Sequence, residues 1–184
     1  MKRIFSGLAL FALASSPALA ANWAMVPAQS TLGFSGVQTG APFQGTFGQW
    51  SAQISFDPAA PQSAHLKITI ATASAKTGDT QRDEALPGAD WLDAKAFPQA
   101  VFEATGFTPE GGANYQTTGT LTIRGISQKL TLPFSLVVTG NQAVAKGQIT
   151  LKRTDYGVGQ GSWATGDWVA LNAGVNFTLV ANKD

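Results

Sequence analysis

The chain has 184 residues, a formal net charge of +1 and no cysteine. Charged residues make up 12% of it, against ~25% in a typical globular protein. Nucleic acids and anionic membrane surfaces reward clustered basic charge, which is absent here, so we expect neither as a partner. Without disulfides, stability has to come from core burial and backbone pairing.

Residues 1–20 have the pattern of a cleavable signal peptide. Lys2 and Arg3 precede an apolar run over residues 4–14, and Ala18-Leu19-Ala20 supplies the small-x-small cleavage pattern. The run is shorter than the ~20 residues that a membrane-spanning helix needs. We therefore predict a signal peptide over residues 1–20, export from the cytoplasm, no membrane span, and one domain over residues 21–184 with a net charge of −1, since Lys2 and Arg3 leave with the signal.

Period-two alternation of apolar residues begins in a long segment over residues 43–56. Phe43 and Phe47 occupy odd positions, whereas the next apolar residues occupy even ones: Trp50, Ala52, Ile54 and Phe56. The phase changes near Gly48, and a change of phase with a glycine is typical of a β-bulge in a long strand.

The same alternation predicts further strands at residues 66–70, 115–123, 130–138 and 169–179. The segments between strands contain dipeptides that favour hairpin turns: Gly111-Gly112, Arg124-Gly125 and Gly140-Asn141. About eight strands with short connections indicate an antiparallel sheet in an all-β domain.

Residues 77–98 interrupt the alternation and hold five of the eleven acidic residues. Asp79 is in position to cap a short helix that ends near Leu86, and Asp90 to cap a second one that Pro98 terminates. We therefore expect one or two short helices inserted between strands, covering one end of the domain.

An antiparallel sheet of this size either folds into a sandwich or closes into a barrel, and alternation does not distinguish the two. The apolar strand faces are rich in Phe, Leu, Ile and Trp, with few polar residues between them. A cavity lined in this way suits a lipid chain.

The residues that catalysis and metal binding require are scarce. His65 is the single histidine, we expect it to point outward, and the chain has neither a cysteine nor a G-x-S-x-G nucleophile motif. Asp79, Asp83 and Asp90 do not have the spacing of a calcium loop, and we interpret them as helix caps with an ion pair from Arg82. We predict no catalytic residue and no metal site.

The glycine-rich segment over residues 157–161 lacks the Lys-Ser/Thr and the following helix of a phosphate-binding loop. We interpret it as a loop between the last two strands, and we expect no cofactor.

Arg153 and Asp155 are two residues apart and would share one face of a strand. We expect them to pair with Arg82 and Asp83 and so attach the helical insertion to the rim of the domain. In the alternative, Arg82, Arg124 or Arg153 contacts the head group of a ligand.

A series of segments in order along the mature chain carries a family resemblance: residues 30–34, 45–47, 56–58, 77–79, 82–83, 90–93, 97–98, 102, 119–125 and 153–159. Together they resemble the YceI-like family of periplasmic lipid-binding proteins. The resemblance implies an extended antiparallel eight-stranded lipocalin-like barrel that holds a polyisoprenoid chain. The chain departs from the common family pattern at Ala85, where a histidine is usual, and at Trp91-Leu92-Asp93, where many members have Phe-Phe-Asp.

We therefore predict a periplasmic protein, not an enzyme, that binds, transports or sequesters an isoprenoid lipid, either an isoprenoid quinone or a polyprenyl chain. The aromatic residues expected to contact this ligand are Phe34, Phe47, Trp50, Phe56, Trp91, Phe102, Phe134 and Phe177. Two alternatives stay open: an interaction module or accessory of a membrane cytochrome b-type redox protein, and an enzyme acting on a hydrophobic exported substrate. A homodimer also stays open.

Overall fold

The computed structural model describes residues 21–184, and the predicted signal peptide lies outside the described residues. The strands of the described chain have these bounds: β1 (Ala21–Met25), β2 (Thr31–Gln38), β3 (Ala41–Phe47), β4 (Trp50–Phe56), β5 (His65–Ala71), β6 (Ala75–Lys76), β7 (Gln99–Thr105), β8 (Thr108–Gly111), β9 (Asn114–Ile123), β10 (Ile126–Thr139), β11 (Gln142–Lys152) and β12 (Asn172–Lys183). One short α-helix, α1 (Thr80–Ala85), and five 3₁₀ turns complete the described elements.

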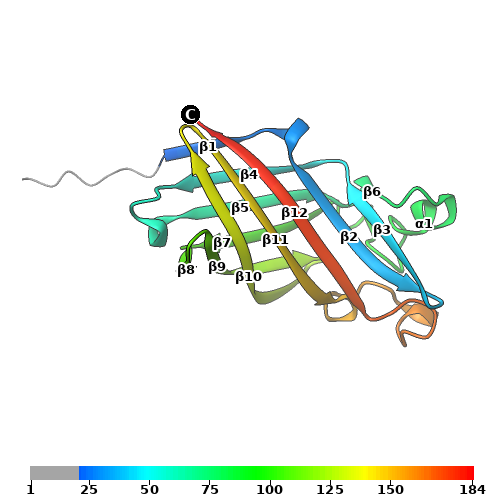
Figure 1. Ribbon diagram of the computed structural model, residues 1–184. Helices are drawn as coiled ribbons and strands as arrows, with labels where there is room; N and C mark the ends of the chain where they lie inside the picture. Colours follow the sequence, from blue (N-terminus) through cyan, green and yellow to red (C-terminus); the bar gives the residue numbers. More distant parts are fainter. Residues whose placement is uncertain (1–20) are drawn as a thin grey trace, which may run out of the picture.

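Four long strands of the barrel are each interrupted once, so that each consists of two consecutive strands: β1 and β2, β3 and β4, β5 and β6, and β7 and β8. Together with β9, β10, β11 and β12 they make eight long strands. β1 pairs with both β12 and β4, and β2 pairs with both β12 and β3, all antiparallel. The sheet is thereby closed, and Figure 1 shows the long strands crossing at a steep tilt around a common interior. The prediction of an all-β, eight-stranded antiparallel barrel is confirmed, and the sandwich is excluded.

The local turn predictions are also confirmed. Arg124 and Gly125 have φ of 50° and 74°, which is the pattern of the type I′ turns that join two antiparallel strands. Gly111-Gly112 lies at the turn between β8 and β9 and Gly140-Asn141 at the turn between β10 and β11, and the phase change near Gly48 coincides with the break between β3 and β4.

Of the one or two short helices expected between strands, residues 21–184 contain one, α1. Asp79 caps α1, since its Oδ1 accepts the backbone N–H of Arg82 at 3.0 Å. The segment from Asp90 toward Pro98, where a second helix was considered, is a series of turns. The carbonyl of Asp90 accepts the N–H groups of Gly159 and Gln160 at 2.8 Å, and Asp93 has a φ of 47° that a helix cannot continue through.

The two ends of the barrel differ. At the end near the C-terminus, the interior is filled by aromatic side chains, among them Trp23, Phe56, Phe107 and Phe134. The Trp23 Nε1 donates to the carbonyl of Phe56 at 2.9 Å, so the buried indole is satisfied there. At the opposite end lie α1 and the loop between β11 and β12 (Figure 1). We call these the closed end and the loop end.

Inward-facing glycines make room for phenylalanine rings in the barrel wall. A Cβ placed on Gly36, Gly45, Gly119 or Gly147 would lie less than 3.0 Å from a ring carbon on an adjacent strand. The rings concerned belong, in the same order, to Phe43, Phe34, Phe102 and Phe177. Each ring covers a glycine, as in the aromatic rescue known from other sheets, so it lies along the wall and leaves space in the interior.

This packing predicts that alanine substitutions at Gly45 and at Gly48 have unequal effects on the free energy of unfolding. At Gly45 the new methyl group meets the ring of Phe34 and the carbonyl of Lys76, whereas at Gly48 the nearest atom is 3.9 Å away. We expect Gly45→Ala to lower the free energy of unfolding by ~1–3 kcal/mol and Gly48→Ala to change it by less than ~0.5 kcal/mol. Urea denaturation measures both, and equal stabilities would contradict the ring-over-glycine packing.

Candidate functional site

The interior between the closed end and the loop end is an apolar cavity of about 220 Å³, which we call the lumen. Its wall comes from the inward positions of all eight long strands, and loop residues cover it. The main lining residues are Leu32, Phe34, Phe43, Phe47, Ile68, Ile70, Phe102, Leu121, Ile123, Leu130, Leu132, Ile149, Leu151, Val175 and Phe177 from the strands, with Leu86, Trp91, Leu92, Tyr156, Val158 and Val169 from the loops.

The eight aromatic residues predicted to contact a ligand fall into three groups. Five of them line the lumen: Phe34, Phe47, Trp91, Phe102 and Phe177. Phe56 and Phe134 line a second, smaller cavity of about 60 Å³ at the closed end, which Phe177 lines as well. Trp50 packs against the aromatic cluster of the closed end and lines neither cavity. Contact with a ligand stays a prediction for all eight.

The aliphatic residues of the lumen wall and the lining residues that come from loops were not among the predicted ligand contacts. Ile68 and Leu130 lie on strand faces whose inward phase was evident, so the same alternation would have identified them. Leu86 and Tyr156 come from loops that no period describes, whereas Val169 had been predicted as the first inward residue of the last strand and lies just before β12. Their place in the lining depends on contacts between distant parts of the chain.

A second space, about 280 Å³ in volume, adjoins the lumen at the loop end. We call it the vestibule. It is lined by Gln38, Asp79, Gln81, Arg82, Ala85 and Trp163, and it shares Phe43, Leu86, Trp91 and Val169 with the lumen. Ligand pockets typically measure ~300–1,000 Å³, and the lumen and vestibule reach this range only together.

Trp91 stands where the vestibule meets the lumen. The Nη1 of Arg124 donates to the carbonyls of Trp91 and Ala89, both at 2.7 Å. The Trp91 ring packs against that of Trp163 at a centroid distance of 5.5 Å, and the Arg153 guanidinium lies 5.3 Å from the ring centroid. The loop that carries Trp91 is thus attached to the rest of the loop end on several sides.

Among residues 21–184, Arg153 is the one charged residue in the lining of the lumen, and all the N–H groups of its side chain are hydrogen-bonded within the protein. The residue is 6% exposed. Its Nε donates to the carbonyl of Ala170, its Nη1 to those of Val158 and Gly159, and its Nη2 to those of Trp163 and Val169. Since a guanidinium has five N–H donors, none is left for a ligand. Burial lowers the pKa of Arg153.

The predicted pairing of Arg153 and Asp155 with Arg82 and Asp83 is therefore wrong. Residues Arg153–Tyr156 form a 3₁₀ turn instead of a strand, which turns the two side chains apart. Arg153 enters the interior, whereas Asp155 lies 3.7 Å from Lys152 on the surface. Burial, and after it the charge of Asp155, raise the pKa of Tyr156.

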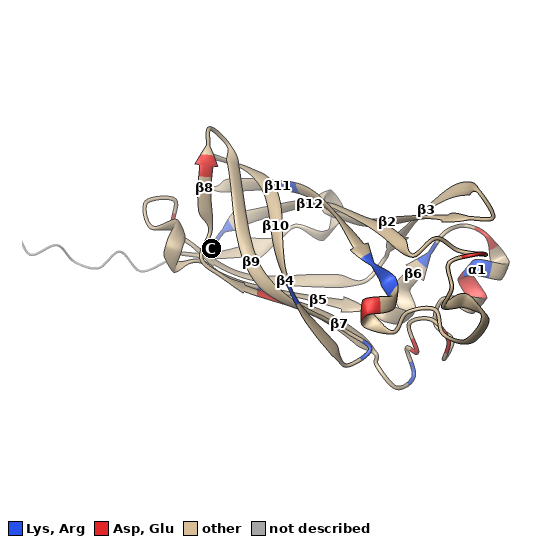
Figure 2. Cartoon of the chain, turned by 90° about the horizontal axis from the view of Figure 1, so that it is seen from below, with Lys and Arg blue, Asp and Glu red and all other residues tan. Residues whose placement is uncertain are grey.

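The charged groups of the vestibule also have partners within the protein. Arg82 lies 3.6 Å from Asp79, as the cap-and-ion-pair interpretation expected, and its Nη1 donates to the side chain of Gln38 at 3.0 Å. Asp83, on the same helix but outside the vestibule lining, accepts the backbone N–H and the hydroxyl of Thr77, and the backbone bond above all lowers the pKa of Asp83. In Figure 2 the charged residues gather mainly around α1 and the neighbouring loops.

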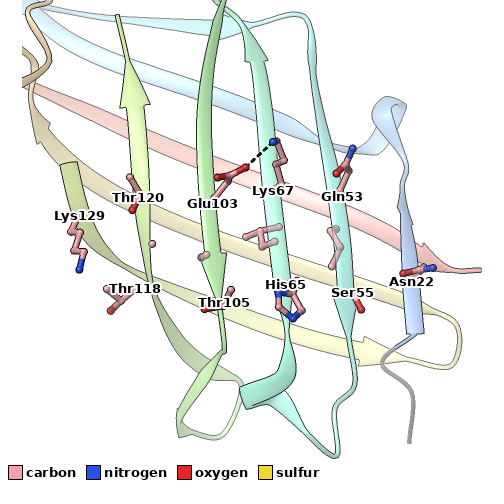
Figure 3. A pocket seen from close by; sticks show the side chains of 14 residues that line it. Asn22, Gln53, Ser55, His65, Lys67, Glu103, Thr105, Thr118, Thr120 and Lys129 are labelled. Atoms are coloured by element: carbon pink, nitrogen blue, oxygen red, sulfur yellow. Dashed lines mark ion pairs between the residues drawn. The ribbon is translucent and has the colours of Figure 1, made fainter. Parts of the chain in front are cut away.

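A polar groove of about 570 Å³ lies on the outer face of β4, β5, β7 and β9. Figure 3 shows His65 there, beside the Lys67–Glu103 ion pair of 2.7 Å. His65 is exposed, as predicted. Among residues 21–184 no three His, Asp or Glu side chains gather as a metal site would require, and no helix in that range is long and apolar enough to cross a membrane.

Comparison with curated proteins finds relatives of moderate similarity. Protein YceI of Escherichia coli is 33% identical over 125 residues, which is 61% of this chain and 65% of the relative. A UPF0312 protein of Azotobacter vinelandii is 29% identical over 120 residues, 62% of each protein. The matched part thus spans less than two thirds of the length of either relative.

Solved structures match over more of the chain. The crystal structure of Burkholderia cenocepacia BcnA is 35% identical with a TM-score of 0.82, covering 86% of this chain and 99% of that one. A polyisoprenoid binding domain from Saccharophagus degradans has a TM-score of 0.70 at 14% identity, covering 90% and 99%. At that identity the similarity shows the fold alone.

The model of the YceI-like domain matches residues 23–181, nearly the whole described chain. The protein therefore belongs to the YceI-like family.

Proposed function

We propose that this protein binds an isoprenoid lipid, with the hydrocarbon chain in the lumen and the head group in the vestibule. The observation that carries the proposal is the lumen itself: an apolar space whose one charged lining residue, Arg153, has no N–H left to donate. A hydrocarbon chain matches such a wall, whereas a polar substrate would lose its hydration there without compensation.

Burial of the chain supplies the affinity. Each CH₂ moved out of water contributes ~0.8 kcal/mol, so a few isoprene units offset the cost of ordering the ligand. The aromatic rings over the wall glycines are in place without a ligand, and this reduces the reorganisation that binding requires. The fold shared with a domain described as polyisoprenoid binding supports this choice of ligand.

The vestibule favours an uncharged head group. Arg153 has all its N–H groups bonded to backbone carbonyls, and Arg82 lies 3.6 Å from Asp79, whose carboxylate would repel a diphosphate. The side chain of Gln81 and the indole of Trp163 line the same space and suit a flat or hydroxylated head group. The proposed ligands are therefore an isoprenoid quinone or a polyprenol.

We also propose that the protein acts in the periplasm, where it carries or sequesters this lipid, and that it is not an enzyme. The support is the signal-peptide pattern of residues 1–20 and the absence of a catalytic set in the sequence. Release of the protein by osmotic shock, with the first 20 residues removed, is the expected result. Retention of the whole chain in the cytoplasm would contradict this part of the proposal.

Calorimetric titration of lipid-free protein tests the ligand class. We expect farnesol to bind with a negative heat-capacity change, the mark of apolar burial. Farnesyl diphosphate has the same tail, and we expect it to bind at least ~10-fold more weakly, because ~1.4 kcal/mol of uncompensated charge is enough for that factor. Absence of binding by farnesol would contradict the proposed function, and tighter binding of the diphosphate would contradict the assignment of the head group.

A further inference from the structure

The lumen and the small cavity of the closed end meet at a single level of the barrel. Leu132 on β10 and Phe177 on β12 line both cavities. Two residues closer to the loop end on the same strands, Leu130 and Val175 line the lumen alone. Two residues closer to the closed end, Phe134 and Leu179 line the small cavity alone.

The ring of Phe177 owes its position at this level to Gly147. Gly147 on β11 pairs with Phe134 on one side and with Phe177 on the other. A Cβ on Gly147 would lie 2.6 Å from the Phe177 ring. The missing side chain thus lets the ring occupy the boundary between the cavities.

Beyond this level the barrel offers no way out. The small cavity measures about 60 Å³ against about 220 Å³ for the lumen. Behind it, Phe56 packs on Phe107 at 5.5 Å between ring centroids, and Phe107 on Phe134 at 5.1 Å. A chain that enters from the vestibule therefore has to end near Phe177.

We propose that Phe177, with Leu132, is the floor of the lumen and sets the maximum length of the isoprenoid chain that the protein accepts. This inference rests on the proposed function, since it assumes that the tail lies in the lumen. It makes Phe177 a specificity-determining residue: isoprenoids with tails up to the floor are held completely, and longer tails have to leave their excess outside the barrel.

The test is competitive loading of lipid-free protein with a mixture of all-trans polyprenols that differ by single isoprene units, followed by extraction and mass spectrometry. Phe177→Ala joins the two cavities, and we expect the longest well-retained polyprenol to grow by one isoprene unit or more. Phe177→Leu keeps more of the packing and is expected to shift the distribution in the same direction. Thermal unfolding of each variant establishes that it is folded.

Phe34→Ala is the matched control. Phe34 also lines the lumen and also covers a wall glycine, Gly45, but it does not line the small cavity. We expect this variant to bind polyprenols more weakly, because it loses a lining ring, but with the same maximum length as the unchanged protein. An equal shift in Phe34→Ala and Phe177→Ala would overturn the floor assignment, because it would follow from lost volume anywhere in the lumen.

A second substitution reverses the effect. Ala145 lines the small cavity alone, so Ala145→Leu fills the space that Phe177→Ala opens, and the double variant should return to the original length. Ala145→Leu on its own should change nothing, and a shorter maximum there would mean that the tail already passes Phe177. If the unchanged protein retains no polyprenol, the proposed function fails; if it retains them and Phe177→Ala causes no shift, the floor assignment alone fails.

Discussion

Replacement of Arg153 by leucine is expected to lower the free energy of unfolding by ~3–5 kcal/mol, because it leaves five buried or partly buried carbonyls without their donor. Those carbonyls belong to the loop between β11 and β12, which covers the lumen. We expect the loop to lose its order and the protein to lose bound lipid with it. Urea denaturation of lipid-free protein is the measurement, since a bound ligand would add its own stabilisation.

Two comparisons separate this role from a general effect of charge. Lys152 precedes Arg153 and makes an exposed contact of 3.7 Å with Asp155, so Lys152→Leu should cost no more than ~1 kcal/mol. Arg153→Lys keeps the charge but has three donors in place of five, and we expect an intermediate loss. Equal stabilities of Arg153→Leu and Lys152→Leu would show that the carbonyl contacts contribute little.

The substitution Ile149→Trp is expected to displace the lipid while the barrel stays folded. Ile149 on β11 points into the lumen, and the larger indole would fill much of a cavity of about 220 Å³. We expect at least a ~10-fold loss of polyprenol affinity, equivalent to ~1.4 kcal/mol. Because the substitution adds an apolar group to an apolar space, it introduces no buried charge.

The neighbouring position provides the control. Thr150 lies on the same strand and faces outward, where it is exposed. Thr150→Trp adds the same indole to the outer surface and should leave lipid binding within ~2-fold of the unchanged protein, a difference of under ~0.5 kcal/mol. The comparison uses calorimetric titration with one polyprenol, and a similar loss in both variants would place the ligand outside the lumen.

Sequence patterns predicted the features that depend on neighbouring residues. Alternation identified β3, β4, β5, β9, β10 and most of β12, the positive φ of Arg124 and Gly125 lies at a predicted turn, and the cap by Asp79 depends on Arg82, three residues away. Closure of the sheet could not be predicted from alternation, since strands of a sandwich and strands of a barrel show the same alternation of apolar residues. The barrel was predicted from the family resemblance.

The errors concern contacts of loop residues, which follow no period in the sequence. The segment after Asp90 is not helical because its carbonyl binds the N–H groups of Gly159 and Gln160. Arg153 makes no ion pair because the carbonyls of its own loop surround it.

The positions of the candidate site residues could be predicted from the sequence only in part. Alternation indicated that Phe56 and Trp50 face inward, but not how deep in the barrel each lies. Phe56 lies at the small cavity and Trp50 against the closed-end cluster, and this depth depends on the tilt and register of eight strands.

The most direct test of the account is to purify the mature protein from the periplasm and extract it with organic solvent for mass spectrometry. We expect a series of isoprenoid lipids with uncharged head groups, present in the unchanged protein and in Thr150→Trp and depleted in Ile149→Trp. Repeated extraction without any isoprenoid, from protein whose lumen is shown by crystallography to be filled with its own side chains, would contradict it.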